Sequence, residues 1–326
     1  MRDFRRIILR RVISLFVTFL LVICINFLLF RMMPGDPLQF MVPSDPKIPD
    51  EYKKMLIERY HLDDSMSEQF IIYIKGIFTL DFGESFIHKV PAMDYLLEYI
   101  PWTLLLVGIA SFFMIVIGML IGIIAAWKRG GLFDSGSLAF SLFFYAMPTF
   151  WLAMIMVMAF AITWNIFPPS RALDIGTQFE LTLASVKDLL HHLVLPVTCL
   201  VLVYIATFSL VMRGSLSDVM TEDYITTARA KGLSEKAVLK DHAVPNAILP
   251  MLILIALTVA YIVGGAFMVE YVFEYPGVGW ATIVAVNEED WPVLQAAFFL
   301  IAVAVIIANF VSDIVMLYLD PRVELS

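Results

Sequence analysis

The residues that could act as metal ligands or nucleophiles are few, and their spacing does not suit that chemistry. His191 and His192 are adjacent, and successive residues on a helix point about 100° apart, which makes a poor pair of ligands for one ion. We expect them to cap the outer end of an apolar helix. Ser215 follows Gly214 but lacks the G-x-S-x-G context of a hydrolase nucleophile. We therefore predict no catalytic residue and no metal site.

The sequence also lacks the G-x-x-x-x-G-K-[ST] loop that cradles the phosphates of ATP. We expect this chain to hold no cofactor, and we predict no nucleic acid as a partner. The segment 213–246 is more informative, because it is polar within a mostly apolar chain. Its five basic and five acidic residues differ from a lipid-binding loop, which would be one-sidedly basic. The mixture suits docking to another protein, and the alternative is a solvated loop that contacts nothing.

The same segment predicts two short helices joined by a stiff turn. Residues 222–231 are compatible with a helix, and Gly232 falls where a helix end needs a left-handed residue. Ser234 is a good N-cap for a second helix, with Glu235 in its first turn. Pro245 cannot continue that helix regularly, so we expect it to redirect the chain toward the next apolar segment. The result would be a rigid protrusion.

The elements around this protrusion are membrane spans. Of the 326 residues, 60% are hydrophobic and 16% charged, whereas a soluble domain carries about 25% charged residues. A span needs roughly 20 apolar residues. Cys24 and Cys199 lie in apolar runs, so no disulfide framework is expected. Six windows qualify as spans: Val12–Phe30, Trp102–Ala126, Leu138–Thr163, Leu193–Met212, Ala247–Val269 and Pro292–Leu319. We predict an all-α polytopic membrane protein with six transmembrane helices, the first being an uncleaved anchor.

Orientation follows from the distribution of Lys and Arg. The segments 1–11, 127–137, 213–246 and 320–326 hold 13 of these residues in 63 positions, whereas 31–100, 164–192 and 270–291 hold 9 in 121. The positive-inside rule places the first set, with both termini, in the cytoplasm. The expected organisation is a cytoplasmic N-terminus with the first span (1–30), an extracytoplasmic segment (31–100), a five-helix core (101–319) and a cytoplasmic tail (320–326).

The extracytoplasmic segment 31–100 is acidic and partly helical by pattern. Residues 50–59 read as a short helix with an acidic N-terminus. Further along, Phe70, Ile74, Ile77 and Phe78 share a helical face. That face predicts a helix lying on the outer leaflet or against the bundle, and a small lid over the bundle is the alternative.

Segment 213–246 resembles the cytoplasmic loop of permease subunits from binding-protein-dependent ABC importers. The family pattern is EAA, three residues, Gly, nine residues, then I-x-L-P. Gly232 and Pro245 match its glycine and proline, and Ala228 matches its second alanine. Thr226, Thr227, His242 and Val244 depart from the general motif but fit the dipeptide/oligopeptide branch, where TARAKGL and H-A-x-x-N are typical. The resemblance implies an ATPase-coupling role for this set: Tyr224, Thr227, Ala228, Arg229, Ala230, Lys231, Gly232, Leu233, Ser234, His242, Pro245 and Asn246.

Further blocks of that branch occur in order along the whole chain. They are R-x-x-P-G-D-P (Arg31, Pro34, Gly35, Asp36, Pro37), D-L-G-x-S (Asp81, Phe82, Gly83, Ser85), P-x-T-L (Pro101, Thr103, Leu104), E-x-V-F-x-x-P-G-x-G (Glu270, Val272, Phe273, Pro276, Gly277, Gly279) and N-x-x-x-D followed by D-P-R (Asn309, Asp313, Asp320, Pro321, Arg322). We expect these residues to have structural roles.

The resemblance implies half of a translocation pathway for dipeptides or oligopeptides in the cell membrane. Its partners would be a second homologous permease, two ABC ATPase subunits that bind ATP and Mg²⁺, and an extracytoplasmic substrate-binding protein. The same architecture could carry nickel or oligosaccharides. An ATP-independent secondary transporter is the alternative of another class, but such proteins place ionisable residues near the midplane, and the predicted span centres here are nearly free of charge.

Two patterns inside the spans have structural explanations as alternatives to functional ones. Gly118-x-x-x-Gly122 permits close helix contact, and we expect packing within the chain. The third span is rich in methionine, which could line a pathway for varied peptides because its side chain is flexible and polarizable. A lipid-facing or core surface is the simpler explanation. The methionines are Met147, Met154, Met156 and Met158.

Overall fold

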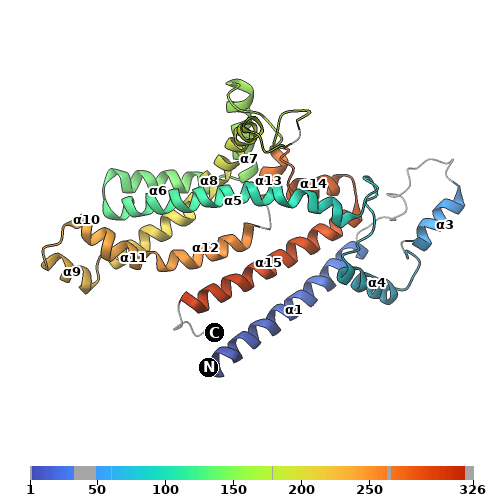
Figure 1. The fold of residues 1–326 in the computed structure, drawn as a ribbon, viewed down its shortest axis with the longest axis horizontal. Coiled ribbons are helices and arrows are strands. Elements are labelled where there is room, and N and C mark those ends of the chain that lie inside the picture. The colour runs from blue at the N-terminus through green and yellow to red at the C-terminus, as the bar shows by residue number, and fades with distance from the viewer. Residues whose placement is uncertain (1, 33–48, 60, 178, 263–265, 320–326) are drawn as a thin grey trace.

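The protein is helical throughout the part of the chain that the structure describes. The computed structural model describes residues 2–32, 49–59, 61–177, 179–262 and 266–319. Within these ranges the only extended pairing is one isolated bridge between Glu84 and Pro91. The predicted all-α class is therefore confirmed. Figure 1 shows an elongated bundle, with the small helices α9 and α10 at one end and α3 and α4 at the other.

Four helices are long and apolar enough to cross a membrane. They are α1 (Arg2–Met32), α5 (Ala92–Trp127), α8 (Leu183–Val219) and α15 (Trp291–Leu319). They contain the first, second, fourth and sixth predicted spans. Helices of 36 and 37 residues measure about 55 Å, so α5 and α8 extend well beyond a hydrocarbon core of about 30 Å.

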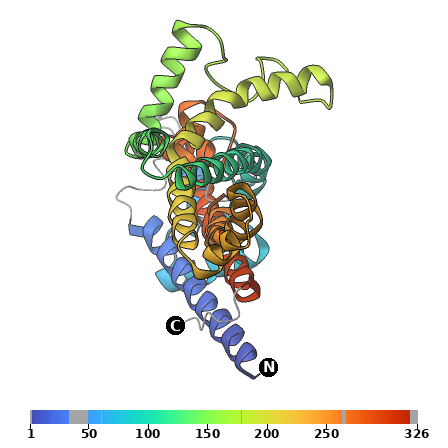
Figure 2. The ribbon, with the colours of Figure 1, turned by 90° about the vertical axis from the view of Figure 1, so that its left-hand side faces the viewer.

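The third predicted span, 138–163, is a bent pair of helices. The first is α6 (Leu132–Tyr145), and the second joins α7 (Thr149–Met156) to a π-helical turn, η1 (Val157–Thr163). The two parts are bent by 98°. Pro148 lies at the break; proline disfavours a helical conformation in the residue before it and lacks an N–H for the ladder. Figure 2 shows α7 and the start of α8 splaying away from the bundle.

The fifth predicted span, 247–269, is divided among three helices in the structure. These are α11 (Val244–Ala247), α12 (Leu249–Ile262) and α13 (Phe267–Val272), and residues 263–265 lie outside the described part of the chain. The described residues therefore contain four spanning helices, or five if the bent pair is one span.

Helices α5 and α8 pack closely because two glycines remove side chains from their interface. A Cβ on Gly118 would lie 2.7 Å from the Cβ of Phe208, and one on Gly122 would lie 2.6 Å from the Ser209 carbonyl oxygen. Real Cβ atoms do not come that close to other heavy atoms. The Gly-x-x-x-Gly pattern thus serves packing within the chain, as expected from the sequence.

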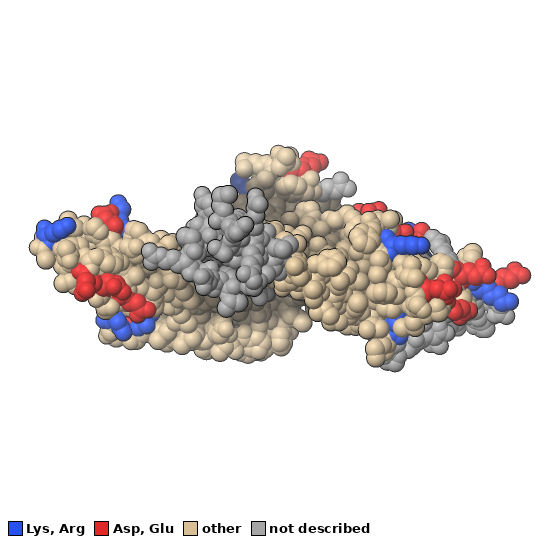
Figure 3. Space-filling model, turned by 90° about the horizontal axis from the view of Figure 1, so that it is seen from below, with Lys and Arg blue, Asp and Glu red and all other residues tan. Residues whose placement is uncertain are grey.

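Two apolar clusters hold the bundle together. The larger lies between α5 and α8 and extends to α7, α12 and α13, with Phe208, Met212 and Met251 among its fully buried side chains. The smaller joins α1, α15, α14 (Val278–Asn287), the start of α5 and α4 (Met66–Thr79). The helix α3 (Asp50–Arg59) has the bounds that the sequence predicted. Figure 3 shows most of the visible charged side chains toward the two ends of the molecule.

Candidate functional site

The segment that sequence analysis singled out forms a compact helical unit at one end of the bundle (Figure 1). It consists of α9 (Asp223–Ala230), α10 (Glu235–Ala237), a π-helical turn η2 (Val238–Ala243) and α11. Gly232 has φ +82°, the left-handed conformation that was predicted for it. A Cβ at this position would meet no atom within 4 Å, so only the backbone conformation requires glycine here.

The turn around Gly232 is fixed from both sides. The Ser234 side chain accepts a hydrogen bond from the Ala237 N–H at 3.3 Å, which makes it the predicted N-cap. Arg229 at the end of α9 donates two hydrogen bonds to Glu235, at 2.9 and 3.3 Å. The pair spans the turn and holds α9 against the start of α10. Sequence analysis noted both charges but did not pair them.

A continuous apolar face attaches this unit to α8. Ile225 and Ala228 of α9 are buried together with Val238 of η2, and all three belong to the cluster that includes Leu216 of α8. Ser215 of α8 also donates to the Ala247 carbonyl at 2.9 Å. Because buried contacts connect the unit to the long helix, a displacement of α9 and η2 would be transmitted to α8.

Pro245 follows an irregular, π-helical stretch of the second helix, in line with the prediction that the helix cannot continue regularly there. It lies in the first turn of α11, directly after η2, and the helical path runs on to Ala247. Proline is tolerated in a first turn because its missing N–H needs no partner there. Asn246 donates to the His242 carbonyl at 2.7 Å.

Most of the proposed coupling residues face outward. Ala228 is buried and therefore supports the packing of α9, and His242 is half-buried. The remaining members are exposed: Tyr224, Thr227, Arg229, Ala230, Lys231, Gly232, Leu233, Ser234, Pro245 and Asn246. The arrangement is a rigid body with a mixed polar and apolar outer surface, which is suited to contact another protein.

An ion pair holds a neighbouring loop to the same end of α8. Arg213 donates to Asp134 at the start of α6, with Nη2 2.9 Å from Oδ2. The same carboxylate accepts the Gly130 N–H at 2.9 Å. Asp134 is buried, so the pair fixes the 128–134 turn beside the helical unit. Asp134 is an acidic residue in a basic loop, and this contrast of charge was the only feature of the sequence that pointed to the ion pair.

At the opposite end, Glu270 organises the E-x-V-F-x-x-P-G-x-G block. Its carboxylate is fully buried and accepts hydrogen bonds from the Gly279 N–H at 2.7 Å, the Trp280 N–H at 3.3 Å and the Thr103 hydroxyl at 3.0 Å. Gly279 and Trp280 lie in the first turn of α14, where free N–H groups and the helix dipole favour a negative charge. The carboxylate thus caps α14 from outside that helix.

The two glycines of this block make room for the carboxylate. A Cβ on Gly277 would lie 2.3 Å from the Glu270 carboxyl carbon, and one on Gly279 would lie 2.6 Å from the Phe267 Cα. The P-x-T-L block joins the same network, because the Thr103 hydroxyl also accepts the Val278 N–H at 2.8 Å. Two blocks that are far apart in the sequence therefore form one polar cluster.

The D-L-G-x-S block is held by Asp290, which sequence analysis missed. Ser85 donates its hydroxyl to the Asp290 carboxylate, and the Phe86 N–H donates to the same group at 3.2 Å. Asp290 is almost completely buried. Within the block, Asp81 accepts the Gly83 N–H at 3.0 Å. Segment 81–91 is thereby attached to the start of α15.

The segment 164–182 is attached to the same end of the molecule. The Arg171 N–H donates to the Phe273 carbonyl at 2.7 Å. His191 lies 3.0 Å from the Ile166 carbonyl, and His192 is buried with its Nδ1 3.0 Å from Asp188. The two histidines thus have separate partners, but they do not cap the helix as expected, because α8 begins at Leu183 with Thr182 as its N-cap.

The remaining blocks lie on α1 and α15. Arg31, in the last turn of α1, stands over the ring of Phe27 at 5.7 Å. Asp313 pairs with Arg11 at 3.1 Å, and Asn309 is exposed one turn earlier. Seven motif residues lie outside the described residues: Pro34, Gly35, Asp36, Pro37, Asp320, Pro321 and Arg322.

Comparisons with known proteins agree over the whole chain. A family model described as a binding-protein-dependent transport system inner membrane component matches residues 118–325, and its N-terminal companion matches 4–107. The di/tripeptide transport system permease protein DppB of Pseudomonas aeruginosa is 34% identical, and the dipeptide permease protein DppB of Escherichia coli is 32% identical. The oligopeptide permease protein AppB of Bacillus subtilis is 31% identical. Each comparison covers 97% of this chain and 98% of the relative.

Proposed function

This chain belongs to the family of binding-protein-dependent transport system inner membrane components, and we propose that it is a permease subunit of an ATP-driven importer of dipeptides or oligopeptides. The substrate class rests on relatives that are named as di/tripeptide, dipeptide and oligopeptide permeases. The chain would form half of the pathway beside a second permease. Two ATPase subunits would bind ATP and Mg²⁺.

The proposed topology has six spans with both termini in the cytoplasm. It is supported by contacts between loops that are assigned to the same side of the membrane. The loops assigned to the inner side touch one another through Arg213 and Asp134. Those assigned to the outer side touch through Ser85 and Asp290 and through Arg171 and Phe273. We retain 31–100 as the extracytoplasmic segment and 101–319 as the permease core.

The observation that carries the coupling proposal is the rigid helical unit 223–247, packed on α8 with an exposed outer surface. In our proposal this unit docks on one ATPase. A partner can only bias a conformational equilibrium if it binds the two states differently. The ATP-closed ATPase dimer would favour the outward-open state by displacing α9 and η2. The buried contacts with α8 would then carry the displacement into the bundle, and hydrolysis would reset it.

On the other side, an extracytoplasmic binding protein would deliver the substrate. Its docking surface would be formed by 31–100, 164–192 and 273–291. The Glu270 and Asp290 networks attach these segments to the helices, so docking could be transmitted to α5, α14 and α15. Because ATP drives transport in this scheme, it needs no charged residue in the described parts of the spans to bind a coupling ion.

Gentle purification of the chain with a C-terminal tag tests the architecture. We expect a second polytopic permease and P-loop ATPases to co-purify in stoichiometric amounts. If the chain emerges alone or as a homo-oligomer, the ATP-independent transporter becomes the better interpretation. Uptake of a labelled dipeptide by the reconstituted complex, compared with nickel and with an oligosaccharide, tests the substrate class separately. Transport of either competitor without peptide uptake would overturn it.

A further inference from the structure

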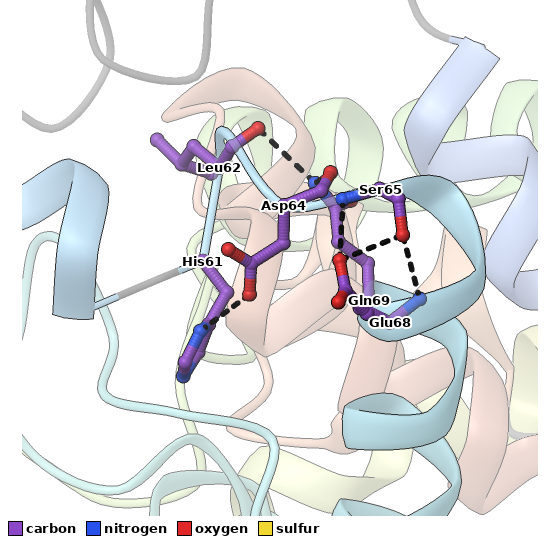
Figure 4. Close-up of polar contacts among 6 residues, drawn as sticks. All are labelled: His61, Leu62, Asp64, Ser65, Glu68 and Gln69. Atoms are coloured by element: carbon purple, nitrogen blue, oxygen red, sulfur yellow. Dashed lines mark hydrogen bonds and ion pairs between the residues drawn. The ribbon is translucent and has the colours of Figure 1, made fainter.

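The helix α4 in the extracytoplasmic segment is a well-defined element whose start is fixed by its own side chains. Figure 4 shows the contacts. The Glu68 carboxylate accepts the Ser65 N–H at 3.0 Å, and the Ser65 hydroxyl accepts the Glu68 N–H at 3.4 Å, forming a capping box. Gln69 donates to the Leu62 and Asp64 carbonyls at 3.1 and 3.0 Å. These local contacts fix where the helix begins.

One face of α4 packs against the end of α1. The ring of Phe27 lies 5.1 Å from that of Phe70 and 5.6 Å from that of Tyr73. Asn26 donates to the Tyr73 hydroxyl at 2.9 Å. Ile77 is buried in the same cluster. The sequence-based expectation that α4 lies against the bundle is correct for this face.

The contact with α1 gives the depth of α4 in the membrane. Arg31 lies one turn beyond Phe27, at the end of a long apolar helix, and arginines at such ends extend their charge to the membrane–water boundary. The Arg31 guanidinium stands 5.7 Å from the Phe27 ring, so Phe27 lies close to this boundary. Because Phe70 meets the Phe27 ring edge-on and Tyr73 stacks on it, α4 lies at the level of the boundary.

The opposite face of α4 is apolar and uncovered in the described part of the chain. Phe78 is 80% exposed and Ile71 53% exposed, although both are large and hydrophobic. Lys75 is exposed between them, and the spacing of four and three residues places all three on one face. Phe78 was expected to share one face with Phe70, Ile74 and Ile77, but it lies about 100° from Ile77 around the helix and is exposed where Ile77 is buried.

We propose that this face of α4 is inserted in the interface of the outer leaflet, with phospholipid as its partner. The ring of Phe78 and the side chain of Ile71 enter the boundary of the acyl chains, and the Lys75 ammonium contacts lipid phosphate. On α1, Leu28, Leu29 and Met32 are exposed on the side away from this contact, near the same end of the helix. An exposed apolar helix face at the level of the membrane boundary is best covered by lipid.

Spin labels test this placement on the full chain with its co-purifying subunits, reconstituted in nanodiscs of phosphatidylethanolamine and phosphatidylglycerol. Exposed Cys24 is replaced by serine, and buried Cys199 stays. The label is placed by Phe78→Cys, with Leu29→Cys as the lipid-facing control and Asp63→Cys as the water-facing control. We expect oxygen to broaden the Phe78→Cys signal nearly as much as that of Leu29→Cys. A water-soluble nickel chelate should affect it several-fold less than Asp63→Cys.

Two results would overturn the proposal. Equal access of the nickel chelate at positions 78 and 63 would place this face of α4 in water. Shielding from both oxygen and nickel would mean that a protein surface covers it. A second pair of variants tests the placement without a label, in case the labelled chain misfolds. Phe78→Leu should preserve the melting temperature in nanodiscs, and Phe78→Glu should lower it. Neither readout requires transport, so the result is independent of the proposed substrate.

Discussion

The Thr103 hydroxyl lies 3.0 Å from a carboxylate oxygen of Glu270, although the two residues are 167 positions apart. The hydroxyl donates to the carboxylate and accepts from Val278, while the carboxylate accepts from two N–H groups of α14. One threonine and one glutamate thus join α5, α13 and α14. This is a short connection between the α13–α14 segment and α5, the helix that packs along α8.

Removing the Glu270 carboxylate should destabilise the outer end of the bundle. Glu270→Ala leaves the Gly279 and Trp280 N–H groups and the Thr103 hydroxyl without their acceptor. An unsatisfied buried polar group costs about 1–3 kcal/mol. We expect a clear fall in the melting temperature of the purified chain in detergent. Glu270→Gln should fall less, since its amide keeps one acceptor oxygen. A wild-type melting temperature for Glu270→Ala would contradict the capping role.

Gly279→Ala should also lower the melting temperature, for a steric reason. Its Cβ would stand 2.6 Å from the Phe267 Cα and 2.8 Å from a Glu270 oxygen, and overpacking of this kind costs about 1–3 kcal/mol. Gly108→Ala in α5 is the matched control, because a Cβ there meets no atom within 4 Å. Equal melting temperatures for the two variants would show that α14 can move away from Glu270 at no cost.

Gly232→Val should uncouple transport while leaving the membrane bundle intact. A β-branched residue at φ +82° costs of order 1–3 kcal/mol, and the turn is exposed, so the loss is local. We expect normal insertion but a several-fold fall in ATPase stimulation by the binding protein. Gly232→Asn, which tolerates this conformation better, should retain more stimulation. Normal peptide uptake by Gly232→Val would refute the rigid-turn mechanism.

Reversing the charges of Arg229 and Glu235 should show whether the two side chains act as a pair. Arg229→Glu and Glu235→Arg each place like charges opposite one another, and the double exchange restores an ion pair. Both side chains are exposed, so the free energy of unfolding should change by less than about 1 kcal/mol. We expect each single variant to reduce stimulated ATPase activity and the double variant to recover part of it. Additive losses would instead indicate that each residue contacts the ATPase independently.

The start of α4 should loosen in acid. The Ser65 hydroxyl, and then its N–H, hold the pKa of Glu68 below its usual value. A lowered folded-state pKa means that the cap stabilises α4 above the ordinary carboxyl pKa and is lost as the pH falls through the lowered value. Hydrogen exchange of amides 66–70, corrected for intrinsic rates, should therefore accelerate at low pH. Ser65→Ala should show fast exchange at neutral pH already, and equal protection in both proteins would contradict the cap.

The sequence predicted the features that depend on local pattern. The apolar lengths of α1, α5, α8 and α15 were recognisable, as were the turn at Gly232 and the N-cap at Ser234, because each follows from neighbouring residues. The bend after α6 was missed even though Pro148 was visible, since an apolar run longer than 20 residues looks like one span. Contacts over long separations, such as Ser85 with Asp290, could not be predicted because pairing depends on how the helices pack. For the same reason the sequence could not separate Phe78, which is exposed, from Ile77, which packs against the bundle.

The pairing of α1 with α15 has a consequence for biosynthesis. Arg11 finds its carboxylate on Asp313, and Asn26 donates to the Gln295 carbonyl at 3.2 Å. A ribosome makes the first helix more than 250 residues before these partners emerge. During that time Arg11 lacks its carboxylate partner, whereas Asn26 can already donate to Tyr73. A chain truncated before residue 291 would lack both contacts between α1 and α15.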